Sequence, residues 1–250
     1  MNNPHHAYFN DKSDIYRDSR PVYPPELIQY VASLARQHQL AWDCAAGNGQ
    51  AAVGLARYFD AVMATDVSEN QVAHALSHPK VAYSVGSAEN PGFADDSLDL
   101  IVVAQALHWF DHEQFWPEVR RTLKSGGAFA AWGYDWFRIC PQLDRVIETS
   151  ILQPIRSFWA PQNRLLWDGY RDVKLDLQPI QVPEFTLTMD WDLDQLFGYI
   201  HSWSATRRCM EQQGDGFFKG AYGAARAAWG DAGTVRQVTM PIHLLAGRNE

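Results

Sequence analysis

Short apolar runs alternate along this chain with segments in which apolar residues recur every three or four positions. Continuous apolar runs are typical of strands buried on both faces of a parallel sheet, and the longer spacing is typical of amphipathic helices. The alternation therefore predicts an α/β fold, a doubly wound and mostly parallel seven-stranded sheet with helices on both faces. The expected strands of the first half are 40–44, 61–65, 81–85, 98–104 and 128–132. The expected helices there are 24–38, 49–59, 68–78 and 111–123.

The alternation of strand and helix patterns stops after residue 134. Residues 135–179 are rich in Trp, Pro and Arg, and we interpret them as an insertion and not as a second folding unit. Strands at 180–188 and 235–240, with helices at 192–212 and 216–229 between them, are expected to complete the sheet. The expected parts of this single domain, 1–250, are an N-terminal cap with the first helix (1–39), a ligand-binding core (40–134), an insertion or lid (135–179) and a C-terminal part (180–250).

A glycine loop joins the first expected strand to its helix, from Asp43 to Gly49. Glycines at such a junction let the backbone turn sharply and approach a ligand, and the helix N-terminus behind them offers unpaired N–H groups. The second strand ends at Asp66, whose carboxylate is suited to bind both hydroxyls of a ribose. Two consecutive strand and helix units thus predict one nucleotide-type site.

Two ligands satisfy this pattern. The loop fits the G-x-G-x-x-A form of the dinucleotide fingerprint, so an NAD-dependent oxidoreductase is one alternative. A pyrophosphate would favour a loop without negative charge, yet Asp43 opens this loop and Arg57 is the only Lys or Arg in residues 40–78. That combination favours a ligand that carries an ammonium group and no phosphate.

The loop resembles the first motif of the class I S-adenosylmethionine-dependent methyltransferases, acid-x-Gly-x-Gly-x-Gly. Ala45 replaces the first glycine, so the backbone there must accept a residue with a Cβ. The sequence HWFD at 108–111, the pattern Y-x-x-x-R-P-x-Y-P at 16–24 and WSA at 203–205 resemble the trans-aconitate methyltransferase subgroup. The resemblance implies S-adenosylmethionine as cofactor and methyl transfer to a small-molecule acceptor. A non-catalytic S-adenosylmethionine-binding module is the other alternative.

The resemblance also implies which residues bind the cofactor. The segment after the third strand is similar to the family's adenine-binding region, with Ser87 in the position of an acid. Arg20 or Tyr16 is expected to hold the carboxylate of the cofactor. The full expected set is Tyr16, Arg20, Asp43, Ala45, Gly47, Asn48, Gly49, Asp66, Val67, Ser87, Ala88, Glu89, Gln105 and Ala106.

His108 follows the fourth strand at the carboxyl edge, where open α/β sheets bind ligands. It is a candidate general base, with a structural role as the alternative. His112 lies four residues further, a spacing found in metal sites, but no third ligand is apparent and no metal is predicted. Asp111 is well placed to cap the following helix.

Aromatic residues make up 13% of the chain, and many of its ten tryptophans lie beyond residue 132. They fit either a packed cap or a lid over an acceptor pocket. The candidate pocket residues are Tyr23, Trp109, Trp136 and Trp203. A carboxylate is one candidate acceptor, because Arg17, Arg20, Arg207 and Arg208 offer guanidinium forks.

Charge and composition exclude several classes of function. The net charge of −8 disfavours nucleic acid as a partner. Three widely spaced cysteines argue against a disulfide framework, and no apolar run reaches the ~20 residues of a membrane span. We therefore expect a cytoplasmic protein that acts on a small molecule away from membranes.

Overall fold

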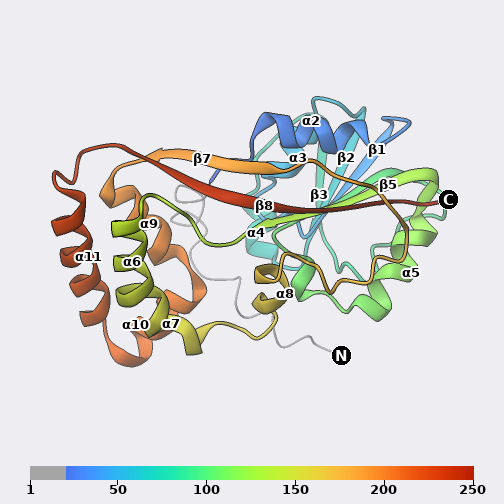
Figure 1. Ribbon diagram of the computed structural model, residues 1–250. Coiled ribbons are helices and arrows are strands. Elements are labelled where there is room, and N and C mark those ends of the chain that lie inside the picture. The colour runs from blue at the N-terminus through green and yellow to red at the C-terminus, as the bar shows by residue number, and fades with distance from the viewer. Residues whose placement is uncertain (1–20) are drawn as a thin grey trace.

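The computed structural model describes residues 21–250 and contains one eight-stranded mixed sheet (Figure 1). The strands are β1 (Leu40–Cys44), β2 (Ala61–Asp66), β3 (Val81–Val85), β4 (Leu98–Ala104), β5 (Leu123–Tyr134), β6 (Gln178–Pro179), β7 (Phe185–Trp191) and β8 (Arg236–Arg248). Their order is β3-β2-β1-β4-β5-β8-β6, and β7 also pairs with β8. The predicted fold class is confirmed, with eight strands in place of seven.

The strands β1 to β5 are parallel to one another, and β8 joins them antiparallel beside β5. The chain runs outward from β1 through β2 to β3, and then crosses back to β4 on the other side of β1. The gap between the carboxyl ends of β1 and β4 is therefore the topological switch point, where open α/β sheets bind their ligands. The glycine loop follows β1 at this point.

Two of the core helices begin at a capping side chain. The core helices are α2 (Pro25–Ser33), α3 (Gln50–Leu55), α4 (Glu69–Ala73), the 3-10 turn η2 (Leu107–Trp109) and α5 (His112–Thr122). Ser68 caps α4 by accepting a hydrogen bond from the amide of Gln71. Asp111 caps α5 by accepting from the amide of Glu113, as predicted. The helices α2, α3 and α4 end several residues earlier than the periodic pattern indicated.

A cap of helices stands beyond one end of the sheet, and the long strands β7 and β8 run out to it (Figure 1). Its first segment holds α6 (Pro141–Ile147), η3 (Glu148–Leu152), α7 (Gln153–Ile155) and η4 (Arg156–Phe158). Its second segment holds α9 (Leu193–Ser202), α10 (Ser204–Gln213) and α11 (Gly216–Trp229). α11 packs on α6 and η3, and α10 packs on η4. The cap is therefore built from two segments of the chain, of which the sequence analysis assigned only the first to a lid.

Between the two cap segments, α8 (Asn163–Trp167) returns to the sheet and contacts β5 and η2. The Gly-rich stretch 124–127 lies within β5, which begins at Leu123, whereas the predicted strand began at residue 128. Leu98 pairs with Leu123 and Leu100 pairs with Ala128, so the intervening residues form a bulge in the ladder. The helix ends where it was predicted to end, but the strand begins earlier than predicted, because pairing with β4 begins directly after α5.

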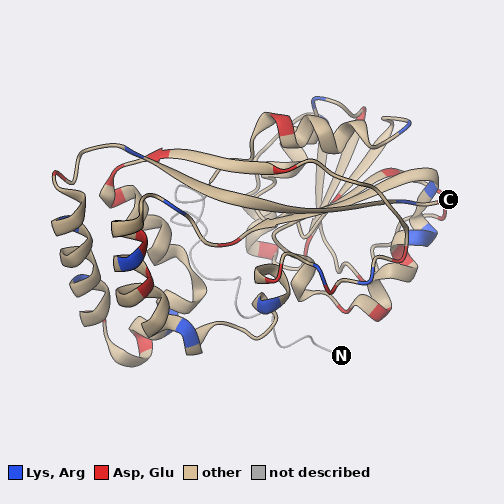
Figure 2. Ribbon diagram, in the orientation of Figure 1, with Lys and Arg blue, Asp and Glu red and all other residues tan. Residues whose placement is uncertain are grey.

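Apolar side chains of the sheet divide between two cores, one on each face. Along β4, Leu100 and Val102 join the core that continues into the cap, whereas Ile101 and Val103 join the core under α5 and α8. Acidic and basic residues are interspersed over the sheet and the cap (Figure 2). None of the helices in residues 21–250 combines the length and apolar character that crossing a bilayer requires.

Candidate functional site

The loop between β1 and α3 has an unusual backbone. Ala45, Gly47 and Gly49 all adopt positive φ angles, of 57°, 55° and 85°. The loop is fastened to the neighbouring strand because the amide of Ala46 donates to the carbonyl of Thr65 at 2.9 Å. Alternate left-handed residues turn the chain tightly into the N-terminus of α3, which is the geometry expected of a ligand-binding loop.

The two glycines of this loop serve different purposes. A Cβ added at Gly47 would meet no atom of residues 21–250 within 4 Å. A Cβ at Gly49 would overlap the hydroxyl oxygen of Tyr83, which itself donates to the carbonyl of Leu76 at 2.7 Å. Gly49 is therefore required by a side chain of the protein, whereas no described residue fills the space beside Gly47.

Ala45 carries a Cβ at a left-handed position. That conformation costs an L-residue about 1–2 kcal/mol relative to glycine. We expect Ala45→Gly to raise the free energy of unfolding by up to ~1 kcal/mol, because the greater freedom of glycine in the unfolded chain offsets part of the gain. Urea unfolding measures the change. A loss of stability would show that the methyl group of Ala45 is held by contacts that outweigh the backbone strain.

Asp66 connects the second strand to the loop. Its Oδ2 accepts from the amide of Gly47 and its Oδ1 from the amide of Ser68, both at 2.9 Å. The side chain is 9% exposed. A carboxylate offers about four acceptor positions in all, which suits a group that binds backbone amides and a pair of hydroxyls together.

Asp43 is the most unusual charged group of the site. It is fully buried at the end of β1, and within the described residues neither carboxylate oxygen accepts a hydrogen bond of normal geometry. Burial raises the pKa of Asp43 to about 7, the amide of Ala52 opposes this, and the nearby negative charge of Asp66 adds to it. A buried carboxylate of this kind beside an open loop fits a cationic group of a ligand.

The segment after β3 is organised by Glu89. Ser87 donates its hydroxyl to this carboxylate, and the amide of Asp111 donates to it at 3.1 Å. The turn is thereby tied to the start of α5. Ala88 is buried and Val67, after β2, is half-buried. The expected adenine-binding residues thus lie on anchored turns after neighbouring parallel strands.

Gln105, after β4, has a positive φ of 60° and its amide donates to the carbonyl of Trp132. Its side chain exchanges two hydrogen bonds, at 3.2 and 3.3 Å, with the backbone of Tyr134. This clamp joins the carboxyl ends of β4 and β5. Gln105 therefore fixes the ends of the two strands relative to each other. The next residue, Ala106, is buried.

Gly133, near the end of β5, is required by close packing. A Cβ there would overlap Cδ1 of Leu166, and it would lie 2.7 Å from Oε1 of Gln105 and 3.0 Å from the hydroxyl of Tyr170. We expect Gly133→Ala to lower the free energy of unfolding by about 1–3 kcal/mol, as overpacking does. Gly198→Ala, in α9 with no atom within 4 Å, is the matched control and should be neutral or stabilising. Equal stability of the two variants would contradict the packing described here.

His108 is buried, 6% exposed, in η2. Its Nδ1 lies 3.4 Å from the hydroxyl of Tyr170, a residue whose pKa is raised by burial. The Nε2 of His112 lies 2.9 Å from the carbonyl oxygen of Leu107. The two histidines thus have different partners, and among residues 21–250 no three His, Cys, Asp or Glu side chains are grouped as metal ligands. Tyr170 was not among the predicted site residues, because it lies 62 residues from His108 in the sequence.

Four tryptophans meet just beyond the carboxyl end of β5. Trp136 contacts Trp159, Trp167 and Trp203, with ring centroids 5.7, 5.3 and 5.8 Å away. Trp136 and Trp159 pack against the core on one face of the sheet, and Trp167 packs against the core on the other. The cluster therefore bridges both faces at the edge where ligands bind. Trp159 and Trp167 were missed, although their position in the Trp-rich insertion was a signal.

The other predicted pocket residues lie around this edge. Tyr23 packs its ring against Trp132 of β5 at 5.4 Å, and the half-buried Trp109 packs against His108 at 4.9 Å. Arg208 donates to the carbonyl of Phe158, next to the tryptophan cluster. The predicted residues Tyr16, Arg17 and Arg20 lie outside the described residues.

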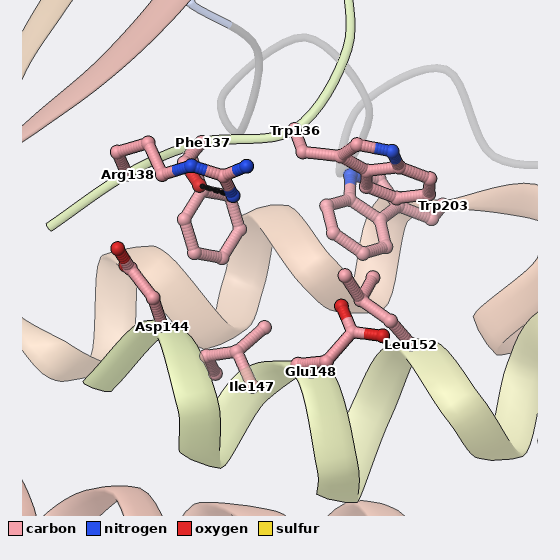
Figure 3. Close-up of a pocket in the computed structure, with 8 residues that line it drawn as sticks. All are labelled: Trp136, Phe137, Arg138, Asp144, Ile147, Glu148, Leu152 and Trp203. Atoms are coloured by element: carbon pink, nitrogen blue, oxygen red, sulfur yellow. Dashed lines mark hydrogen bonds between the residues drawn. The ribbon is translucent and has the colours of Figure 1, made fainter. Parts of the chain in front are cut away.

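A pocket of about 260 Å³, its open mouth included, adjoins the cluster within the cap (Figure 3). Trp136 and Trp203 lie together at one end, and side chains of α6 and η3 face them. The lining residues are Trp136, Phe137, Arg138, Asp144, Ile147, Glu148, Leu152 and Trp203.

The comparisons with known proteins agree with this geometry. Residues 42–131, which span β1 to most of β5, match the model of a family described as "Methyltransferase domain". Two relatives carry the name "putative methyltransferase". The one from Dictyostelium discoideum is 33% identical over 204 residues, 78% of each chain. The other, called a type II methyltransferase, is a solved structure from Anaeromyxobacter dehalogenans, 36% identical with a TM-score of 0.86 over 92% of this chain and 97% of that one.

A more distant structure supports the fold alone. The YcgJ protein of Bacillus subtilis is 20% identical, with a TM-score of 0.54 over 90% of this chain and 97% of that chain. The nearer relatives decide between the two enzymes that the glycine loop allowed, and the NAD-dependent alternative is set aside. The chain belongs to the class I S-adenosylmethionine-dependent methyltransferases, and S-adenosylmethionine is its methyl donor.

Proposed function

We propose that this enzyme transfers the methyl group to a small-molecule acceptor bound between the carboxyl edge of the sheet and the helical cap. The tryptophan cluster carries this proposal, because four large aromatic rings bridge both faces of the sheet beside the end of β5. The family model ends at residue 131, so the cap lies outside the part of the chain that matches it. A donor site typical of the family, combined with a separate aromatic cap, is the arrangement expected of an enzyme that selects its own small acceptor.

The described residues fit the donor. The open space beside Gly47 accommodates a ligand against the backbone, and the buried carboxylate of Asp43 suits the ammonium of the methionine part. We assign the ribose hydroxyls to Asp66 and the adenine side to the turns at 87–89 and 105–106. Asn48, Gly49, Ala45 and Val67 shape the walls between these points.

The sulfonium of the bound donor supplies an activated methyl group that needs no further activation. The protein then has to hold the acceptor in line with that methyl group and exclude water, which is worth up to ~7–11 kcal/mol in favourable cases. A carboxylate acceptor requires no base. A hydroxyl acceptor loses a proton on methylation, and we assign His108 to receive it, with Tyr170 as the residue that orients the imidazole through Nδ1.

The proposal is tested by incubating the enzyme with methyl-labelled donor and a panel of carboxylates, phenols, thiols and amines, all of them small molecules. We expect label in a small-molecule product and none in added tRNA or protein. Label that enters only macromolecules would overturn the small-molecule acceptor. Binding of donor without transfer to any acceptor class would favour the non-catalytic module.

A further inference from the structure

The ladder between β5 and β8 is interrupted where the chain leaves the sheet for the cap. The last regular pair is Tyr134 with Ile242. The next bridge, between Arg138 and Thr239, is displaced by one residue. Three residues on the β5 side, 135–137, therefore lie opposite two on the β8 side, and this segment is a β-bulge. Bulges bend a strand and redirect its side chains, and this bulge lies where the chain enters the tryptophan cluster.

A proline in β8 explains why the ladder is interrupted at this point. Thr239 exchanges both backbone hydrogen bonds with Arg138, at 2.8 and 2.9 Å. The backbone groups of an antiparallel strand alternate between its two edges, so residue 241 faces the β5 side as well. Pro241 has no N–H group, and proline within a sheet is confined to edges and bulges. The bulge cannot receive a backbone hydrogen bond from residue 241, so other groups have to fix its shape.

The carboxylate of Asp135 fixes the bulge. Its Oδ1 accepts from the amide of Trp136 at 2.6 Å, and its Oδ2 lies 3.2 Å from Nε2 of His243. A carboxylate only accepts hydrogen bonds, so Nε2 carries the proton and donates it to this contact. The Asp135 and His243 side chains are 15% and 28% exposed, which limits competition by water. Because His243 belongs to β8, the carboxylate links the backbone of the bulge to the opposite strand.

His243 also lies against the segment that carries Trp167. A Cβ added at Gly169 would be 3.1 Å from Nδ1 of His243, so the backbone at Gly169 packs on the imidazole. Trp167 precedes Gly169 by two residues, and its ring centroid is 5.3 Å from that of Trp136. The imidazole is therefore hydrogen-bonded to the segment of one tryptophan and packed on the segment of the other.

We propose that Asp135 and His243 are positioning residues for methyl transfer, which hold Trp136 in the bulge against Trp167 and so give the acceptor a preformed wall. This inference rests on the proposed function, in which the tryptophan cluster faces the acceptor. Neither Asp135 nor His243 has to touch the acceptor or the donor. Without their contact the bulge would adopt other conformations, and the affinity for the acceptor would fall with the fraction of molecules in which Trp136 is in place.

The first test compares His243→Leu with His243→Gln in the full chain. Leucine removes the donor, whereas the amide nitrogen of glutamine can donate in place of Nε2. The acceptor is the panel compound that the wild-type enzyme methylates with the highest kcat/KM. We expect His243→Leu to raise the KM for this compound about tenfold with kcat within about threefold of wild type, and His243→Gln to stay within about threefold in KM. An unchanged KM in His243→Leu, or an equal rise in both variants, would overturn the proposal.

Thr239→Val is the matched control on the same strand. Thr239 lies at the other end of the bulge, and its hydroxyl is 3.5 Å from the carbonyl oxygen of Arg138. We expect this variant to keep the wild-type KM. A rise of KM equal to that of His243→Leu would show that any change in this part of β8 has the effect, and would also overturn the proposal.

A double variant tests whether the two residues act through one contact. Asp135→Ala should raise the KM at least as much as His243→Leu, because it also removes the acceptor of the Trp136 amide. Asp135→Ala combined with His243→Leu should raise the KM no further than Asp135→Ala alone. Independent effects that multiply in the double variant would contradict a shared role.

Two further measurements separate this inference from the proposed function. Near-UV circular dichroism of the enzyme saturated with S-adenosylhomocysteine reports the packing of the tryptophan cluster. We expect His243→Leu to weaken this signal and Thr239→Val to retain it, with wild-type calorimetric affinity for S-adenosylhomocysteine in both. A loss of that affinity in His243→Leu would contradict a role on the acceptor side. If the wild-type enzyme labels no compound of the panel, the proposed function itself fails, whereas label transfer with an unchanged KM in His243→Leu overturns this inference alone.

Discussion

Gly47→Val is expected to weaken binding of S-adenosylmethionine by at least about 100-fold, or ~2.7 kcal/mol. Its Cβ would enter space that no atom of the described residues occupies within 4 Å, and that space is where we place the cofactor. Part of the effect is backbone strain, because a β-branched residue at a φ of +55° is unfavourable. Isothermal calorimetry measures the affinity, and urea unfolding measures the strain.

Gly230→Val is the matched control for this substitution. Gly230 also has a positive φ, of 87°, and a Cβ added there would likewise meet no atom within 4 Å, but this glycine follows α11 in the cap. We expect a loss of stability, because a φ of 87° with a ψ of −122° lies outside every region that a β-branched residue enters without strain, and we expect unchanged cofactor affinity. If Gly47→Val binds the cofactor as Gly230→Val does, the loop at 45–49 is not the binding site.

Asp43→Asn is expected to stabilise the ligand-free enzyme and to weaken cofactor binding. An aspartate in an unfolded chain ionises near pH 4, whereas burial raises the pKa of Asp43 to about 7 in the folded chain. Asp43 therefore lowers the free energy of unfolding only above about pH 4. This free energy falls further as the pH rises from about 4 to about 7. The variant lacks the penalty and should be more stable by ~2–4 kcal/mol near pH 8, with no advantage near pH 4. Urea unfolding of both proteins at the two pH values measures the difference.

The affinity for the cofactor should also depend on the protonation state of Asp43. A cationic ligand prefers the ionised form, so wild-type affinity should fall by up to about tenfold for each pH unit below 7. Asp43→Asn should bind weakly at every pH and show little of this slope. Calorimetric titrations over a range of pH measure both. A wild-type affinity that is independent of pH would show that Asp43 does not pair with the ammonium group.

Local signals were sufficient to predict the core of the fold. The apolar runs that form β1 and β4 are almost entirely buried, and the capping residues Ser68 and Asp111 fix their helices through side-chain hydrogen bonds. The extent of the helices was overestimated, since apolar spacing continues past the last helical residue. The long strand β8 was underestimated, because it pairs with β5 and β7 in contacts between distant parts of the chain.

The convergence of the loop and the acids that we assign to the donor was also predictable, because residues that follow consecutive parallel strands meet at one edge of the sheet by topology alone. The acceptor side was harder to predict from the sequence. Trp136 and Trp203 were among the predicted pocket residues. Their partner Trp159 lies in the irregular segment before α8, and Trp167 is the last residue of α8. The contact of Tyr170 with His108 depends on a chain reversal at Gly169 and Tyr170, both with positive φ, and sequence spacing carries no sign of it.

A crystal structure with bound S-adenosylhomocysteine tests the central claim most directly. We predict the ligand against the backbone of Gly47, with its ribose hydroxyls hydrogen-bonded to Asp66 and its amino group beside Asp43. Density for the ligand away from this loop, or a pose in which neither carboxylate contacts it, would contradict the assignment of this site.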